Sequence, residues 1–377
     1  MIELYFIGAL LFSLLVGQFG RIELFGKLVN GYIQDPFAFL FVIFLMRQYG
    51  LVPLRNIARH KAVLFFVLTV FLSFVLSLFD YSPVSNAVAL LYLVRIALYM
   101  LLGIYLHTLY KRKKTVVMGA ERLLGFFSIG LLLFSVVQYL FFSDFWGLYA
   151  LGWDPHLYRM SATYIDVYVA AAMYGVFSLY WYRKQKILLA LLFMGCLVFT
   201  FSRSAYVSFL LSALLFFILK KKWKELTVVV ALFALLVVLV PKPFGEGVSL
   251  LRTASVNSRM RDYQMGITMA QKKPIFGYGY NRIRYAKEKL DLAKVDDRSH
   301  AVSSFHSSFL IILVTTGVVG LVSSLFLLFQ YGMNNRGFAP ILFYVCSMSL
   351  FDNVLLHAFI LLPIILIGAQ DDQSSLE

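Results

Sequence analysis

Charged residues are scarce in this sequence. Asp, Glu, Lys and Arg make up 14% of its 377 residues, against roughly a quarter in an ordinary soluble domain. Hydrophobic residues reach 61%, and the mean hydropathy is +0.81. This shortage of charge excludes a soluble globular protein and predicts an integral membrane protein.

Several signatures of catalytic and binding sites are also missing. The two cysteines, Cys196 and Cys346, lie in separate apolar runs, so we expect core residues rather than a disulfide. The sequence has no GxxxxGK[ST] phosphate loop, no HExxH motif and no closely spaced set of histidines and carboxylates. We therefore expect no metal, no cofactor and no nucleic-acid partner.

Apolar runs of membrane-spanning length recur from Ile2 to Ile367. A transmembrane barrel would instead show strictly alternating segments of about ten residues. We therefore predict an all-α polytopic membrane protein with about twelve transmembrane helices. The predicted spans are Ile2–Phe19, Gly31–Tyr49, Ala62–Phe79, Val84–Leu109, Leu123–Phe142, Ser161–Tyr182, Ile187–Ser202, Ser204–Leu219, Leu226–Val240, Ser307–Leu328, Pro340–Leu350 and Val354–Ile367.

Short basic loops alternate with less basic loops along this series of spans. If the amino terminus is cytoplasmic, the clusters RNIARHK (55–61), KRKK (111–114), RKQK (183–186) and KKKWK (220–224) all fall on the inner side. The positive-inside rule requires this of short loops. We therefore predict that both termini of this multi-pass protein are cytoplasmic.

One long outer segment, residues 241–305, is strongly basic and is predicted to form a helical extracytoplasmic loop. Its stretch SRMRDYQMGITMAQKK has helical spacing and stops at Pro274, before the glycine turn FGYGY. A second polar helix is predicted from Asn281 to Val295. The predicted organisation is helices 1 to 9 in residues 1–240, the loop in 241–305, helices 10 to 12 in 306–370 and a polar tail in 371–377.

Polar residues gather at the outer ends of the predicted spans. Arg203 lies at the turn between the seventh and eighth spans, His306 opens the tenth, and Asp352 precedes the last. Arginine offers a rigid fork of donors that suits a phosphate, so this face suits an anionic amphiphile such as a lipid pyrophosphate. Arg95 is predicted to lie mid-membrane, with Asp166 as its partner.

Four blocks of sequence resemble, in order and spacing, the shared core of the O-antigen ligase and O-antigen polymerase superfamily. The resemblance covers roughly Arg159 to Gly320. The blocks are YRMSATYIDVYVAAAMY, TFSRSAYVSFLLSALLFF, NSRMRDYQMGITMAQKKPIFGYGYNRI and HSSFLIILVTTGVVGLV. Members of that family transfer a glycan from undecaprenyl pyrophosphate to an acceptor at the outer face of the bacterial inner membrane, without a metal or a nucleotide sugar.

The resemblance implies roles for individual residues. Arg203 and Arg259 match arginines that hold the donor pyrophosphate, and the register leaves Arg261 as an alternative to Arg259. His306 matches a catalytic histidine near the acceptor hydroxyl, with His300 as the alternative because Ser307 replaces the usual asparagine. Arg159 and Tyr263 also match positions of the family's pattern and are further candidates for substrate binding. Asp352 and Asn353 lie beyond the resemblance and are candidates because the predicted topology puts them at the outer turn before the last span.

The resemblance also implies the partners and the reaction. We expect a donor glycan linked to undecaprenyl pyrophosphate, a lipid or glycolipid acceptor, surrounding membrane lipids, and an inverting transfer at the periplasmic face of the bacterial inner membrane. The leading hypothesis is an O-antigen ligase that uses lipid A core as acceptor. A polymerase that joins lipid-linked repeat units is the alternative, and a flippase for the lipid-linked glycan is a further one.

Overall fold

The computed structural model describes residues 1–24, 28–57, 61–151, 156–243, 246–250, 253–292 and 304–371. These residues are mainly helical, and β1 (Arg21–Leu24) and β2 (Val29–Tyr32) among them form a hairpin that pairs Arg21 with Tyr32. The helices are α1 (Ile2–Val16), α2 (Gln34–Tyr49), α3 (Val52–Ile57), α4 (Lys61–Leu76), α5 (Pro83–Arg112), α6 (Lys114–Phe141), α7 (Val167–Arg183), α8 (Ile187–Phe199), α9 (Arg203–Lys220), α10 (Trp223–Leu239), α11 (Ala254–Lys272), α12 (Ile283–Lys289), α14 (Ser308–Asn334), α15 (Ala339–Ser349) and α16 (Ala358–Asp371).

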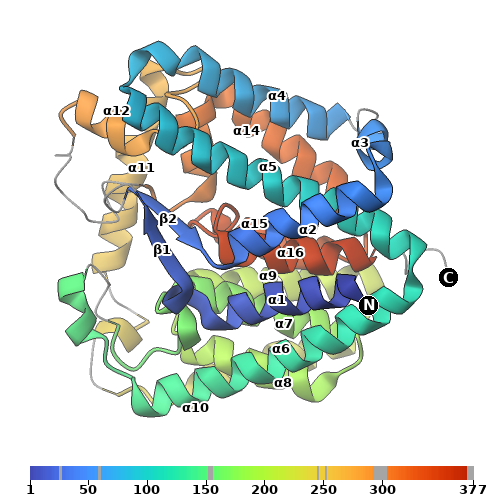
Figure 1. Ribbon diagram of the computed structural model, residues 1–377. Helices are drawn as coiled ribbons and strands as arrows, with labels where there is room; N and C mark the ends of the chain where they lie inside the picture. Colours follow the sequence, from blue (N-terminus) through green and yellow to red (C-terminus); the bar gives the residue numbers. More distant parts are fainter. Residues whose placement is uncertain are drawn as a thin grey trace.

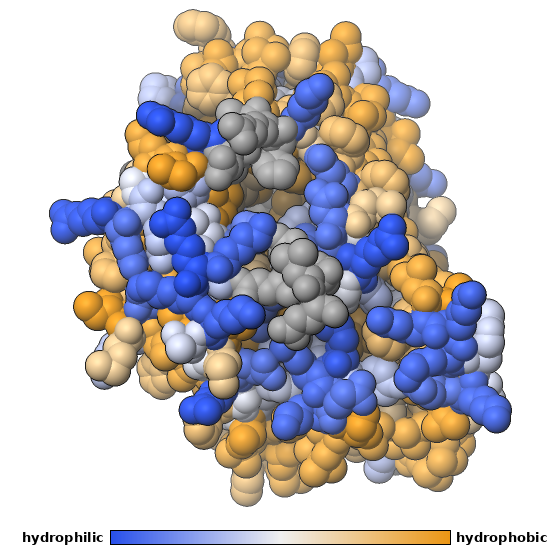
Figure 2. All heavy atoms as spheres, turned by 90° about the vertical axis from the view of Figure 1, so that its right-hand side faces the viewer, coloured by the Kyte–Doolittle hydropathy of each residue, from blue (hydrophilic) through white to orange (hydrophobic). Residues whose placement is uncertain are grey.

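The helices form a bundle with two distinct ends. Figure 1 shows both termini and α3 at one end, and the β1–β2 hairpin, α11 and α12 at the other. Figure 2 looks onto the end that carries the termini, where hydrophilic side chains cover the centre and apolar side chains surround them. This distribution is typical of a helical bundle whose end is exposed to water and whose sides face lipid.

Each of the twelve predicted spans contains a helix, but only part of the predicted membrane topology is confirmed. Six helical segments among the described residues are long and apolar enough to cross a membrane: Ile2–Gly20, Lys61–Asp80, Pro83–Arg112, Lys114–Phe141, Arg203–Lys220 and Ser308–Asn334. Others, such as α8 and α15, are apolar but shorter. The count of twelve therefore stays a prediction.

Helix α7 lies at the centre of the bundle because its small residues admit neighbours on every side. Ala170, Ala171 and Ala172 are fully buried, as expected where helices approach closely in a membrane protein. A Cβ on Gly175 would lie 2.1 Å from the Tyr344 ring of α15. The Tyr344 hydroxyl donates a hydrogen bond of 2.8 Å to the Ala171 carbonyl, so α7 and α15 are locked together.

Helix α14 is broken at Gly317, and residues 274–279 complete its backbone hydrogen bonds. Gly317 has φ 69° and ψ −170°, outside the helical range. The freed Val314 and Thr315 carbonyls accept bonds of 3.0 and 2.9 Å from the amides of residues 278 and 279. In return, the amide of residue 318 donates a bond of 2.8 Å to the carbonyl of Pro274. A helix can break inside an apolar region only where its backbone groups find such partners.

The two helices predicted between α10 and α14 have different outcomes. The first is confirmed as α11, which ends two residues before Pro274. The second was predicted from Asn281 to Val295 but α12 runs only from Ile283 to Lys289, and residues 293–303 lie outside the described part. The glycine turn between them docks on α14 as described above, rather than standing as a free surface turn.

Candidate active site

Helix α11 presents one polar face to the start of α14. Arg259, Asp262 and Gly266 lie three and four residues apart and therefore share this face. Gly266 permits the close approach, because a Cβ there would lie 2.7 Å from the Leu310 side chain of α14. The packing brings Arg259 and Asp262 to the short segment before α14 that carries His306.

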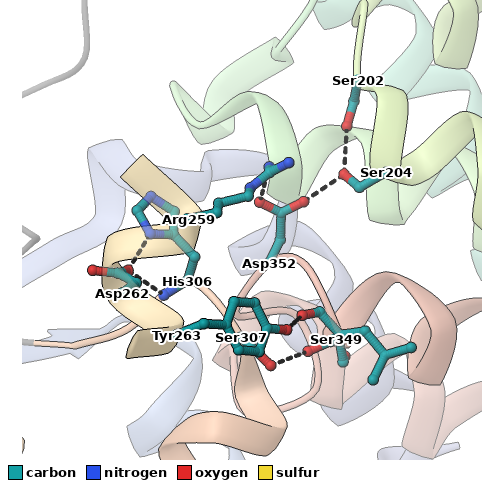
Figure 3. Close-up of polar contacts among 10 residues, drawn as sticks. Ser202, Ser204, Arg259, Asp262, Tyr263, His306, Ser307, Ser349 and Asp352 are labelled. Atoms are coloured by element: carbon teal, nitrogen blue, oxygen red, sulfur yellow. Dashed lines mark hydrogen bonds and ion pairs between the residues drawn. The ribbon is translucent and has the colours of Figure 1, made fainter. Parts of the chain in front are cut away.

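Asp352 links three distant parts of the chain. Its carboxylate receives a hydrogen bond of 2.7 Å from Arg259 Nη2 and one of 2.5 Å from the Ser204 hydroxyl. Ser204 in turn lies 3.2 Å from the Ser202 hydroxyl. The Asp352 side chain is only 5% exposed and Arg259 is 25% exposed, so the ion pair is largely shielded from water. Figure 3 shows these side chains converging from α9, α11 and the turn before α16.

His306 is held by Asp262 through two bonds. The Asp262 carboxylate accepts a hydrogen bond of 3.1 Å from the His306 backbone amide and is paired with His306 Nδ1 (Figure 3). Burial raises the pKa of Asp262, but the hydrogen bonds from His306 outweigh this effect, so the pKa lies below its usual range. The carboxylate is therefore ionised at neutral pH. The His306 side chain is 41% exposed, which leaves it accessible to substrate.

Four further hydrogen bonds fix the backbone around this site. The Tyr263 hydroxyl donates to the Leu350 carbonyl. The Ser307 hydroxyl donates a bond of 3.0 Å to the Ser349 carbonyl and caps α14 by accepting from the Leu310 amide. Asn353 accepts a bond of 3.0 Å from the Ser308 hydroxyl. Tyr263 and Asn353, both predicted to bind substrate, thus join the turn before α16 to α11 and α14.

Arg203 is the first residue of α9, at the turn where the sequence places it. It is half-buried, and its Nη1 donates a hydrogen bond of 3.2 Å to the Leu250 carbonyl. Its sequence neighbours Ser202 and Ser204 belong to the Asp352 network, so the backbone of Arg203 adjoins this network.

The remaining predicted residues fall in different places. Arg159 is buried and its Nε donates a bond of 2.8 Å to the Thr200 carbonyl, which braces the end of α8. Arg261 is exposed on the side of α11 opposite Arg259. His300 lies outside the described residues. The geometry therefore favours Arg259 over Arg261, a choice that the sequence left open.

The predicted pair of Arg95 with Asp166 is wrong. Arg95 Nη2 instead lies 2.8 Å from the Asp35 carboxylate at the start of α2 and donates a bond of 2.5 Å to the Asn30 carbonyl. The guanidinium also packs 5.1 Å from the centre of the Tyr92 ring. The β1–β2 hairpin packs on α5 and leads directly into α2, which brings Asp35 to Arg95. A prediction that compares only how deep each residue lies in the membrane does not reveal this arrangement.

Two residues near His306 were missed by sequence reasoning. Asp262 follows Arg259 by three positions, and this spacing on a predicted helix was the available signal. Lys287 of α12 is 1% exposed, and burial lowers its pKa to about 8. Within the described residues, no group of three or more His, Cys, Asp or Glu side chains could hold a metal ion.

Residues 187–325 match the model of a protein family described as O-antigen ligase. This segment runs from α8 to the middle of α14 and includes Arg203, Arg259, Asp262 and His306. Over this segment the chain is similar to the O-antigen ligase family, which supports its resemblance to that superfamily. Comparison with curated proteins gave no match. The apolar helices and this match support a bacterial membrane protein, and the match suggests a membrane glycosyltransferase of the O-antigen ligase or polymerase type.

Proposed function

We propose that this protein transfers a glycan from undecaprenyl pyrophosphate to a hydroxyl of a lipid-linked acceptor at the extracytoplasmic end of the bundle. One observation carries the proposal: two carboxylates hold Arg259 and His306 on one face of α11, where an anion-binding group and a proton acceptor stand together. The long polar segment with α11 and α12 lies at this end, opposite the termini (Figure 1).

Arg259 retains capacity for the donor pyrophosphate. Its Nη2 is paired with Asp352, but its Nε is buried without a hydrogen-bond partner among the described residues. A buried donor without a partner is costly, so a phosphate oxygen that accepts from Nε would relieve that cost. Arg203, beside the same network, supplies the second cation.

The proposed reaction is a single displacement. His306 accepts the proton of the acceptor hydroxyl as the new bond to the anomeric carbon forms. The bond from that carbon to the pyrophosphate oxygen breaks, and the arginines stabilise the charge that develops on the leaving group. Such a displacement inverts the anomeric configuration, so a product that retains it would contradict the mechanism.

The acceptor distinguishes a ligase from a polymerase. We favour a ligase that uses lipid A core, because the matched family model is described as O-antigen ligase. The joining of two lipid-linked repeat units is the alternative. A flippase would need charged groups through the whole depth of the bundle. The site residues named above instead gather at one end, and we therefore favour transfer over transport.

The test uses purified protein in lipid nanodiscs with a polyprenyl-pyrophosphate glycan and candidate acceptors. We expect Arg259→Ala and His306→Ala to lower transfer by at least about 100-fold, the usual contribution of a general base or a charge-stabilising group. Arg261→Ala, on the exposed side of the same helix, is the matched control and should transfer at close to the wild-type rate. If Arg261→Ala abolishes transfer and Arg259→Ala does not, the assignment is wrong.

A further inference from the structure

The short segment that ends in His306 is anchored by α12. The Lys287 ammonium donates a hydrogen bond of 3.0 Å to the Ser304 carbonyl and lies 4.0 Å from the centre of the Phe305 ring. Phe305 is itself buried at 3% exposure. Lys287 therefore contacts both residues that precede His306: the backbone carbonyl of Ser304 and the aromatic ring of Phe305.

Helix α11 fixes the histidine itself. The same carboxylate oxygen of Asp262 accepts from the His306 backbone amide and faces the ring at Nδ1. An ionised carboxylate can only accept a hydrogen bond, so the neutral ring must carry its proton on Nδ1. The other ring nitrogen, Nε2, is then the free acceptor.

Burying an ammonium is expensive and needs compensation. Lys287 is fully inside the structure, and Asp262 is a nearby charge of opposite sign, since each of the two affects the pKa of the other. If this lysine only filled space in the core, an apolar side chain would give a more stable protein. Its contacts with the segment that precedes His306 give a reason for a charged side chain at this position.

We propose that Asp262 and Lys287 are positioning residues for His306: Asp262 sets the ring tautomer and orientation, and Lys287 holds the 304–306 segment in register with α11. This inference rests on the proposed function for its kinetic consequences, but the tautomer is a property of the unliganded protein. Neither residue needs to touch substrate.

The first experiment reads the tautomer without any substrate. Protein labelled with ¹⁵N-histidine is studied by NMR at a pH where the ring is neutral, and the His306 signals are assigned by their loss in His306→Ala. We expect the Nδ1–H form in wild type. In Asp262→Asn the Nε2–H form, which a free imidazole prefers, should appear. Wild-type protein with Nε2–H would overturn the role of Asp262.

The second experiment measures transfer kinetics. Asp262→Asn should lower kcat by about 100-fold or more with a nearly unchanged KM for the donor, because the general base is misdirected while the arginines still bind pyrophosphate. Lys287→Met should lower kcat by about 10-fold in the same manner. Glu288→Gln removes an exposed charge from the same helix and serves as the control. Wild-type kcat in both test variants would overturn the proposal.

The outcomes separate this inference from the proposed function. If wild type transfers no glycan but the tautomer changes in Asp262→Asn as expected, the proposed function fails and the positioning of the ring stands. If wild type transfers glycan but Asp262→Asn keeps its kcat and its tautomer, the positioning role fails alone. Should Asp262→Asn not fold, Lys287→Met decides: an unchanged kcat contradicts the proposal, and a selective loss supports it.

Discussion

Replacing Lys287 by Met should stabilise the protein at neutral pH even though it lowers activity. Burial lowers the pKa of Lys287 from 10.5 to about 8, and each pKa unit corresponds to about 1.4 kcal/mol, so the buried charge costs about 3 kcal/mol. Methionine has similar length and no charge. The variant also loses the hydrogen bond to the Ser304 carbonyl, and this loss offsets about 1 kcal/mol of the stabilisation. The free energy of unfolding should rise by about 2 kcal/mol at pH 7.

The sign of the pH dependence follows from the lowered pKa. Between pH 8 and 10.5 the unfolded chain keeps the Lys287 proton and the folded chain does not, so the wild-type free energy of unfolding rises with pH. From pH 7 to 9.5 this gain is about 2 kcal/mol. The advantage of Lys287→Met should therefore almost disappear at pH 9.5.

The assay is thermal unfolding of detergent-solubilised wild type and Lys287→Met at pH 7 and pH 9.5. The matched control is Lys289→Met, which removes a lysine that is 57% exposed from the same helix. A Lys287→Met variant that is less stable than wild type at pH 7, by an amount that does not change at pH 9.5, would refute the reasoning.

Three other predictions follow from the contacts. Gly317→Ala should cost at least about 2 kcal/mol of unfolding free energy, because φ is 69° and the new Cβ would lie 2.1 Å from the carbonyl of residue 275; Gly332→Ala, with its nearest contact at 3.6 Å, is the control for thermal unfolding. Arg259→Lys should fold, because a cation still faces Asp352. Its transfer rate in a radiolabelled-glycan assay should nevertheless fall about 10-fold or more, since lysine cannot form a bidentate contact with the donor pyrophosphate. Arg259→Ala should also lower the Tm, because it leaves the Asp352 charge buried without its ion-pair partner; a Tm equal to that of wild type would contradict this.

Much of the architecture could be predicted because it depends on local properties. Apolar runs identify the helices, and basic loops identified Arg203 as a residue at a turn rather than at the centre of a long helix. The block around Arg259 was predicted to be helical and is. These features need only hydrophobicity, charge and helical spacing.

The features that could not be predicted depend on packing between distant segments. The hydrogen bonds between the 274–279 turn and α14 join residues some forty positions apart. Neither the glycines of this turn nor Gly317 of α14 indicates in the sequence which segment it contacts. Arg95 takes Asp35 because the hairpin folds back on α5. The choice of Arg259 over Arg261 required knowing which side of α11 faces α14.

The central claim is that this protein moves a glycan from a polyprenyl pyrophosphate to an acceptor hydroxyl. The most direct measurement incubates purified wild-type protein in nanodiscs, with a chelator present, with the donor and either a lipid A core acceptor or a second donor molecule. The products are then identified by mass spectrometry. The account predicts a glycosylated acceptor and free polyprenyl pyrophosphate in equal amounts. Unchanged donor with every acceptor, from protein shown to be folded, would contradict it.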